Sequence, residues 1–593
     1  MERNRLIKIG IVVFVSLLMW TSSVVEAQNR SKNDIFNQQM QKMGQLVRLV
    51  NYYYVDSVDL STIVEKGIGE MLKELDPHSV YIPQKDVERT NEPLQGNFEG
   101  VGIQFQIVKD TLLVVQPVKG GPAELVGINI GDKIIMIDDS LAVGKICTND
   151  WVFKKLRGKK GSKVVVKVKR GNSPDLLTFT IIRDKIPINS IESYFMIDAT
   201  TGYVKLERFS QTTHTEFVDV MKQLKDEGME NLVLDLRDNT GGFMNIAIDM
   251  ADELLSGEKT VVYTQNNQDF NKTYYATKKN GCFEKGRLVV IINEYSASAS
   301  EILSGAVQDW DRGIVIGRRS FGKGLVQSQI GLPDGSLVRL TTSRYYIPSG
   351  RCIQKPYEDI EDYSQDVIKR YNAGELTHAD SVHFPDSLKF YTAGKRVVYG
   401  GGGIMPDIFV PMDTVKISDY YWKLFRNNIF NQFVFRYLET NKDDILKKYP
   451  HFEDFNRNFE IDATMMNDFF AFAQQEGVYD SIDFNMFAYL EAFLKTKKDS
   501  INKLFDSYDK VKNSNELQQD LLIFIDQHIE DVKKRERNFD TDSHIKRQLR
   551  TLIARNLYSP REATKIWLET DDTYKKAVEV IHDKSYFKKL KIE

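Results

Sequence analysis

Residues 288–310 read LVVIINEYSASASEILSGAVQDW and predict a strand that turns sharply into a helix. The apolar, β-branched run Leu288–Ile292 is typical of a buried strand. A helix is expected over Ser298–Asp309. A serine at such a turn directs its hydroxyl away from the sheet edge, and the N–H groups that open the helix favour a developing negative charge. Taken alone, the same serines would more simply be helix caps.

A lysine between two glycines follows this helix. Ser320–Gln327 reads SFGKGLVQ, which places Lys323 where the backbone can approach closely. Burial would lower the pKa of this lysine, so that a neutral amine could accept a proton from a serine. Gln327, four residues on, could orient that amine. A glycine-rich turn with a solvated lysine is the alternative for this segment alone.

A third segment, residues 235–242, reads DLRDNTGG and predicts a strand that ends in two glycines before a further helix. Glycine lets the backbone direct an N–H group into a cavity. One N–H from Gly241 or Gly242, together with the amide of Ala299, would make an oxyanion hole. The alternative is an ordinary strand–turn–helix connection.

The wider chain divides by pattern. Residues 200–350 alternate strands and helices, which argues for an α/β layered core. Residues 96–184 carry short β-rich runs separated by Gly and Asp turns, and the chain is helical from about residue 415 onward. Residues 355–395 are polar and are expected to be an insertion or a mobile loop.

Composition excludes several classes of protein. A chain of 593 residues is too long for one core, and 42% hydrophobic with 27% charged residues is ordinary for a globular protein. A polytopic membrane protein and a mostly disordered chain are excluded. The net charge of −3 argues against a nucleic-acid partner bound through a strong basic field. There is no CxxC, GxSxG, HExxH or P-loop motif, so no metal or other cofactor is expected.

The N-terminus has the layout of a secretory signal peptide. Arg3, Arg5 and Lys8 precede the apolar run Ile9–Trp20, and cleavage is expected after Ala27. The apolar run is shorter than the roughly 20 residues that span a bilayer. The mature protein is therefore expected to be periplasmic or secreted, with an uncleaved membrane anchor as the alternative.

These segments together resemble the C-terminal processing peptidases, or tail-specific proteases, which use a Ser–Lys dyad. The resemblance rests on SASASE, on FGKGxVQ and on the LRDNxGG segment, and it covers roughly residues 40–412. It implies that Ser298 is the nucleophile, that Lys323 is the general base and that Gln327 supports the lysine. It also implies that Ala299 and Gly241 or Gly242 form the oxyanion hole. Thr240 departs from the family, which has Pro or Ser there.

The β-rich segment resembles a PDZ domain. Gly100, Val101, Gly102 and Ile103 are similar to the carboxylate-binding loop of that family, whose N–H groups hold a chain terminus while the peptide adds as a strand. Arg157 resembles an arginine that couples the PDZ position to the active site in some relatives. The partners implied are protein substrates with free, apolar C-termini; an adaptor protein and a homo-oligomer stay open.

The sequence thus predicts a multi-domain α/β protein. The resemblance implies a ClpP/crotonase-like layered peptidase core with an inserted PDZ domain. The expected parts are a signal peptide (1–27), an N-terminal helical segment (28–95), the PDZ domain (96–184), the serine peptidase core (185–412) and a C-terminal helical domain (413–593). The expected function is a serine endopeptidase that cleaves near protein C-termini. An inactive PDZ scaffold and a structural envelope protein are the alternatives.

Overall fold

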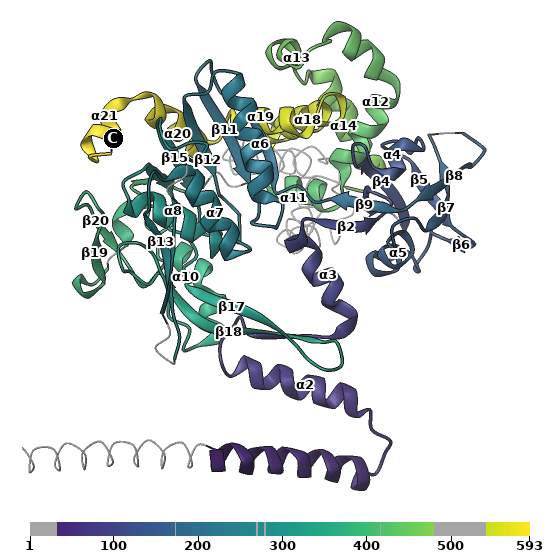
Figure 1. Ribbon diagram of the computed structural model, residues 1–593. Helices are drawn as coiled ribbons and strands as arrows, with labels where there is room; N and C mark the ends of the chain where they lie inside the picture. The colour runs from purple at the N-terminus through teal and green to yellow at the C-terminus, as the bar shows by residue number, and fades with distance from the viewer. Residues whose placement is uncertain are drawn as a thin grey trace, which may run out of the picture. The chain divides into compact units, whose positions relative to one another are not determined.

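A computed structural model describes residues 33–108, 110–171, 173–267, 271–277, 280–382, 384–414, 417–478 and 541–592 (Figure 1). The expected signal peptide and residues 479–540 of the expected C-terminal domain lie outside the described residues. The chain divides into two compact units. One holds residues 1–85 and 328–340, and the other holds residues 86–327 and 341–593.

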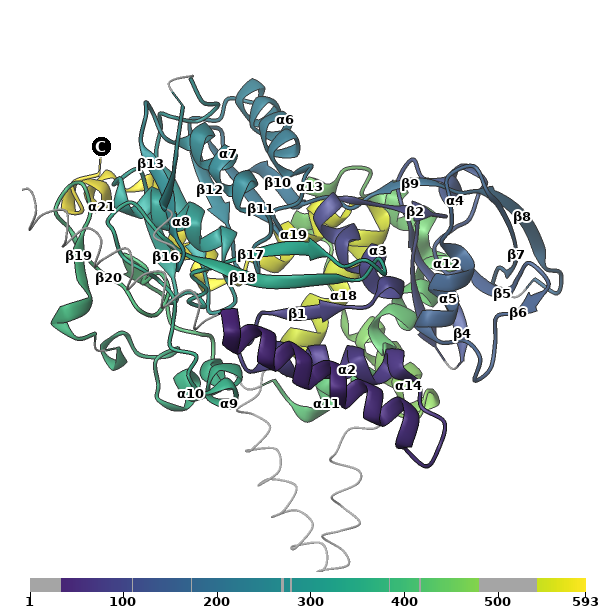
Figure 2. The same ribbon diagram turned by 60° about the horizontal axis from the view of Figure 1, so that its bottom comes forward.

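The smaller unit is mainly helical. Residues 33–53 form a helix, and helix α2 (Leu60–Lys73) begins after Asp59, whose carboxylate accepts the N–H groups of Ser61 and Thr62. Strand β1 (Val80–Ile82) pairs antiparallel with the first residues of β18 (Leu337–Tyr346) (Figure 2).

The β-rich domain lies in the larger unit and has its own core. Its antiparallel sheet has the order β3-β4-β5-β7-β8, and β6 pairs with β5. The bounds are β3 Ile103–Val108, β4 Thr111–Pro117, β5 Lys133–Ile137, β6 Ser140–Leu141, β7 Lys163–Lys169 and β8 Leu177–Ile182, with helices α4 Pro122–Leu125 and α5 Asn149–Leu156. Strands β2 (Asn97–Gly100) and β9 (Asp184–Pro187) pair with each other, so the chain enters and leaves the domain through one ribbon.

The layered core is built on a second sheet, with strand order β10-β11-β12-β15-β16-β21. Its strands are β10 Ile191–Met196, β11 Thr201–Leu206, β12 Asn231–Asp235, β15 Leu288–Ile292, β16 Ile314–Gly317 and β21 Ile408–Phe409. Strand β10 is antiparallel to β11, and the other pairs are parallel. Strands buried on both faces read as continuous apolar runs, which is why Leu288–Ile292 was recognisable in the sequence.

Alternate residues of the central strands β12, β15 and β16 face two different apolar clusters. Leu232 and Leu234 pack with helices α6 (Thr213–Asp226), α7 (Met244–Leu254) and α8 (Ala299–Asp309). Val233, one position on, packs with residues of the C-terminal end of the chain. This period of two is what a strand produces when both faces of its sheet are covered.

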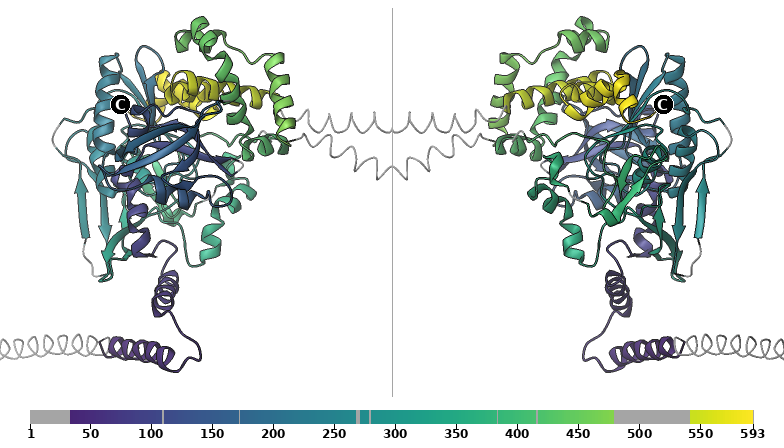
Figure 3. Two further views of the ribbon diagram at one scale, coloured as in Figure 1. Left: turned by 90° about the vertical axis from the view of Figure 1, so that its right-hand side faces the viewer. Right: turned by 90° about the vertical axis from the view of Figure 1, so that its left-hand side faces the viewer.

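The C-terminal helices divide between two clusters. Helices α11 (Asp419–Arg426), α12 (Ile429–Lys448), α13 (Phe452–Asn458), α14 (Ala463–Gln475) and α18 (Thr541–Leu557) share one aromatic-rich core. Helices α20 (Asp572–His582) and α21 (Lys584–Lys589) instead cover the second face of the core sheet, and α19 (Pro560–Leu568) contributes to both clusters (Figure 3). The domain boundary at residue 413 stays a prediction. Helices α20 and α21 pack on the core sheet and are therefore part of the core of that domain.

The mixed α/β architecture with a β-rich insertion and helical end segments is confirmed. Residues 355–395 differ from expectation, because they form helices α9 (Ile360–Ser364) and α10 (Asp366–Asn372) and part of a strand pair, β19 (Lys389–Tyr391) with β20 (Val397–Tyr399). Their polar composition suggested a loop, but several of these polar groups are buried in ion pairs. Among the residues described, no helix has the length and apolar character needed to cross a membrane.

We predict that Ile581→Ala lowers the free energy of unfolding by about 2–5 kcal/mol, because Ile581 is completely buried between α20 and the core sheet. The measurement is the thermal or urea unfolding midpoint. Lys575→Ala, on the exposed side of the same helix, is the matched control and should leave the midpoint unchanged. Equal midpoints for both variants would show that α20 does not belong to the core.

Candidate active site

Ser298 lies directly before α8, in the turn that follows strand β15. Its φ is 56° and its ψ is −113°, a backbone conformation that residues other than glycine rarely adopt. Every residue of α8 is buried, whereas Ser298 is partly exposed. The turn therefore presents one serine at the accessible end of a buried helix.

The carboxylate of Glu301 joins the segments that carry Ser298 and Lys323. Its Oε2 accepts the N–H of Ser298 at 2.8 Å and the N–H of Lys323 at 2.9 Å. Its Oε1 accepts the N–H of Gly322 at 2.7 Å and the hydroxyl of Ser320. One side chain thus fixes the separation of the backbone at both expected catalytic positions.

Burial of Glu301 has an electrostatic consequence. Complete desolvation raises the pKa of this carboxyl group to about 7, because the charged form loses its hydration. The hydrogen bonds from Ser320, Lys323, Gly322 and Ser298 oppose the rise, since each stabilises the ionised form.

The side chain of Lys323 is held by the glutamine expected to orient it. Lys323 Nζ donates to Gln327 Oε1 at 3.1 Å. The flanking glycines are needed for close packing: a Cβ on Gly324 would lie 2.9 Å from the N atom of Gln354. Gly322 has a φ of 89°, which favours glycine in any case.

Tyr345 contacts both segments through their carbonyl groups. Its hydroxyl lies within hydrogen-bond distance of the carbonyl oxygens of Ser298 and Lys323. Burial raises the pKa of Tyr345 well above its usual value, so the hydroxyl stays neutral and keeps its proton to donate. Ser298 and Lys323 are therefore bridged twice, by Glu301 at their N–H groups and by Tyr345 at their carbonyls.

The glycine pair lies against the serine turn. A Cβ on Gly241 would lie 2.8 Å from Ser298 Cβ and 2.9 Å from the N atom of Ala299, so only glycine fits there. The N–H of Gly241 already donates to Asn239 Oδ1 at 2.9 Å. Within the described part of the chain, the N–H groups of Gly242 and Ala299 have no partner. Gly242 and Ala299 are thus the donors available for an oxyanion.

Two arginines hold the loop that precedes Lys323. Arg370 donates to the carbonyl oxygens of Ser320 at 3.2 Å and Arg319 at 2.7 Å. Glu375 accepts from Arg370 at 2.8 Å and from Arg319 at 2.7 Å. Helix α10 therefore fixes the backbone just before Lys323.

A second, buried lysine supports the same loop. Lys355 Nζ lies 3.8 Å from the ring centre of Phe321 and 4.1 Å from that of Tyr363, and it pairs with Asp366 at 3.0 Å. Desolvation lowers the pKa of Lys355, and Asp366 opposes that effect. The backbone N–H of Lys355 donates to the carbonyl of Gly322 at 2.9 Å.

The loop before the glycine pair is anchored by a buried ion pair. Asp235 is fully buried and bonds Arg237 at 2.6 Å, and the attraction of Arg237 and Lys205 holds the pKa of Asp235 well below its usual range. Arg237 also pairs with Asp571 at 2.6 Å, directly before α20. The C-terminal end of the chain thus helps to hold the glycine turn.

These groups suit acyl transfer: a hydroxyl, an amine oriented by an amide, and two N–H donors, one from the glycine turn at Gly242 and one from Ala299, the first residue of the buried helix α8. Among the described residues, no group of three His, Cys, Asp or Glu side chains could hold a metal ion.

Comparisons with known proteins point the same way. Residues 200–362 match the family model described as peptidase family S41, and residues 100–181 match that of the PDZ domain. A carboxy-terminal-processing protease of Bartonella bacilliformis is 30% identical over 434 residues, which cover 71% of this chain and 96% of that protein. The chain belongs to peptidase family S41. It is therefore a serine-type peptidase with a PDZ domain.

Other similar proteins match smaller parts of the chain. A carboxyl-terminal-processing protease of Picosynechococcus is 36% identical over 299 residues, covering 49% of this chain and 70% of that one. The solved photosystem II D1 C-terminal processing protease is 24% identical, covers 63% of this chain and 93% of its own, and has a TM-score of 0.32. Residues 420–504 match a family of unknown function.

In the PDZ domain of this S41 peptidase, the binding role of Gly100–Ile103 stays a prediction, and the structure shows the bonds of this loop. The carbonyl of Val101 accepts the N–H of Ala123 at 3.0 Å, and the carbonyl of Gly102 accepts the N–H of Val118 at 2.8 Å. These two acceptors of the loop are therefore already occupied. Strand β3 follows at the end of its sheet, with β4 as its one neighbour among the described strands.

Arg157 pairs with Glu92, and its guanidinium lies 5.0 Å from the ring centre of Phe98 and 4.8 Å from that of Phe153. Glu92 belongs to helix α3 (Gln84–Gln95), which precedes the domain. The bonds that the structure shows thus connect Arg157 to the entry of the PDZ domain, and its coupling to the dyad stays a prediction.

Two residues that connect the backbones of Ser298 and Lys323 were not identified from the sequence. Glu301 stands three residues after Ser298, the spacing of a capping box, and that pattern was a signal for it. Tyr345 had no such signal, because its contacts come from a distant strand.

We predict that Glu301→Gln lowers kcat at least tenfold, because the amide NH₂ must face either the N–H groups of Ser298 and Lys323 or the N–H of Gly322 and the hydroxyl of Ser320. Stability should respond to pH as well. The folded pKa of about 7 exceeds the ordinary value of 4.5, so the free energy of unfolding falls as pH rises between these values.

The total loss of stability between pH 4.5 and 7 should be of the order of 3 kcal/mol at most, and this pH dependence should disappear in the variant. The measurement compares unfolding midpoints of wild type and variant at pH 4.5, 5.5 and 7, with the exposed Glu227→Gln as control. An unchanged slope in Glu301→Gln would contradict the assignment.

Proposed function

We propose that this S41 peptidase is a periplasmic or secreted endopeptidase that binds the C-terminal tail of protein substrates and cleaves near it with a Ser298–Lys323 dyad. The observation that carries the proposal is the shared bond of Glu301 Oε2 to the N–H groups of both residues. A carboxylate that ties these two backbones together suits a pair of side chains that must act on each other.

Acylation begins with the serine hydroxyl. Ser298 Oγ attacks the scissile carbonyl carbon while its proton passes to the neutral amine of Lys323, and the oxyanion is stabilised by the N–H groups of Ala299 and Gly242. Gln327 keeps the amine in place through its 3.1 Å bond. Collapse of the tetrahedral intermediate breaks the C–N bond, and the lysine gives its proton to the leaving amine.

Deacylation repeats the steps with water. Water attacks the acyl carbon as Lys323 takes one of its protons, and the same proton then returns to Ser298 Oγ as the ester bond breaks. The products are the shortened protein with a new carboxylate and the released tail.

The PDZ domain would select the tail. A free carboxylate binds well to successive N–H donors such as those of Gly100–Ile103, and the preceding residues would add as a strand to the open edge of β3. Ile103 and Phe105 alternate toward the same face of β3, which favours apolar tail residues.

The proposed location rests on the sequence of residues 1–27, which has the layout of a cleaved signal peptide.

We predict that Ser298→Ala and Lys323→Ala each lower proteolysis by about three orders of magnitude or more and that the double variant loses little further, since the pair acts as a unit. The measurement is kcat/KM on a tailed protein, with unchanged melting temperature as evidence of folding. The exposed pair Ser256→Ala and Lys285→Ala is the matched control. Most of the activity surviving in either dyad variant would exclude the dyad.

We predict that a substrate with a free apolar C-terminus has about tenfold higher kcat/KM than its amidated or Asp-ended form. Amidation removes the anionic partner of the loop donors, and an acidic last side chain would lie against the apolar face of Ile103 and Phe105. Arg157→Ala should lower cleavage of long tailed proteins more than cleavage of a short peptide that reaches Ser298 unaided. Equal values for free, amidated and acid-ended substrates would remove the PDZ domain from substrate selection.

A further inference from the structure

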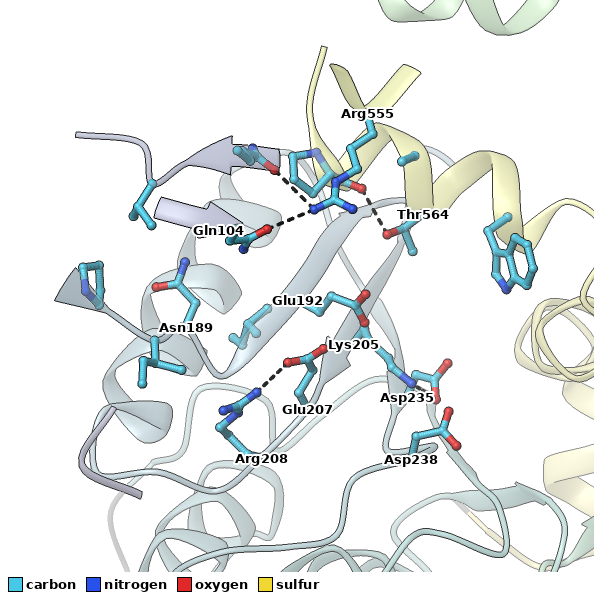
Figure 4. Close-up of a pocket in the computed structure, with 18 of the residues that line it drawn as sticks. Gln104, Asn189, Glu192, Lys205, Glu207, Arg208, Asp235, Asp238, Arg555 and Thr564 are labelled. Atoms are coloured by element: carbon cyan, nitrogen blue, oxygen red, sulfur yellow. Dashed lines mark hydrogen bonds and ion pairs between the residues drawn. The ribbon is translucent and has the colours of Figure 1, made fainter. Parts of the chain in front are cut away.

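A cavity of about 1370 Å³ opens beside the glycine turn (Figure 4). Three parts of the larger unit line it: the PDZ domain with its connecting ribbon, the edge of the core sheet, and helices α18 and α19. Thr240 and Gly241 line it on the core side, and Ile103 and Gln104 of strand β3 line it on the PDZ side. A polypeptide held by both the tail-binding strand and the oxyanion site would therefore have this cavity beside it.

Several cations of the cavity wall are already paired with carboxylates. Lys205 lies 3.7 Å from Asp235, and Arg208 lies 2.9 Å from Glu207. Arg237 bonds both Asp235 and Asp571. Their charges are balanced within the protein, so they offer little to a ligand.

Arg555 is different. It projects from α18 into the cavity and donates to two neutral acceptors, Gln104 Oε1 at 3.1 Å and Gln116 Oε1 at 3.3 Å (Figure 4). Within the described part of the chain, no carboxylate lies within 4 Å of its guanidinium. Burial lowers the pKa of Arg555, and the negative charge of Glu192 opposes that effect.

An arginine side chain stays charged in proteins, so a half-buried guanidinium that no carboxylate contacts has lost hydration that two amide oxygens replace only in part. A carboxylate would replace it better, since it accepts two parallel N–H bonds and carries the opposite charge. The two glutamine side chains can rotate away, because both are bonded to Arg555 by side-chain atoms alone.

We propose that Arg555 is a specificity residue that binds a carboxylate of the polypeptide substrate in this cavity. The inference rests on the proposed function, because it takes the occupant to be a substrate tail. The carboxylate is that of an acidic side chain or of the chain terminus. Helix α18 would then supply a contact to substrate that neither the PDZ domain nor the peptidase core provides.

The experiment measures binding on the inactive Ser298→Ala protein, so that it does not depend on catalysis. Peptide tails carry Asp, Asn or Lys at each position in turn, and every peptide is made as the free acid and as the amide. Dissociation constants are measured by fluorescence anisotropy for Ser298→Ala alone and combined with Arg555→Gln or Arg555→Glu.

If the ligand is an acidic side chain, Asp should bind about tenfold more tightly than Asn at one position. Arg555→Gln should abolish that ratio, and Arg555→Glu should favour Lys there. If the ligand is the terminal carboxylate, the Asp-to-Asn ratio stays near one, and Arg555→Gln instead reduces the ratio between free and amidated tails.

Two variants separate binding from a structural role. Arg550→Gln lies on the same helix but bonds Asn456 and Glu569, outside the cavity, and should leave both ratios unchanged. Gln116→Leu, on β4, removes a neutral partner of Arg555 and should also preserve them. Equal weakening of all peptides by Arg555→Gln, or no change in either ratio, would overturn the proposal.

Failure of the proposed function would look different. In that case, the wild-type protein would not cleave tailed substrates, whereas the binding ratios could still be measured.

Discussion

The carboxylate of Glu301 is the constraint on which the geometry of the active site depends. Because one of its oxygens accepts the N–H groups of both Ser298 and Lys323, the serine turn and the glycine-rich loop cannot separate without leaving buried donors unpaired. Tyr345 repeats the connection at the two carbonyls. The two residues of the proposed dyad are therefore positioned through their backbones.

Such a site is unfavourable by itself and needs a rigid surrounding. The positive φ of Ser298 and the fully buried carboxylate of Glu301 both cost free energy that the rest of the fold must offset. The core sheet supplies that support because it is covered on both faces. Helix α20 covers one of them, and Asp571, just before it, holds Arg237 beside the glycine turn.

The sequence predicted what is local. Ser298 follows a recognisable strand, and Gln327 is only four residues after Lys323. The glycine pair indicates close packing of the backbone. Short sequence patterns were enough to find these residues. Gly241 and Gly242 were not distinguishable, because the bond from Gly241 to Asn239 depends on the folded loop. Tyr345 and Arg555 were out of reach for the same reason, since their partners lie 47 and 451 positions away at Ser298 and Gln104.

Arg157 and Arg555 both connect the PDZ domain to its surroundings, and their partners differ in kind. Arg157 meets the carboxylate of Glu92, which is largely buried, so breaking that pair would leave an uncompensated charge. Arg555 meets only amide oxygens, and charge-assisted hydrogen bonds are roughly twice as strong as neutral ones. A carboxylate ligand can therefore displace the partners of Arg555 with a net gain, whereas it cannot do so at Arg157. The contact between the PDZ domain and α3 is thus fixed. On the side of α18, where the cavity lies, a ligand can compete for the guanidinium of Arg555.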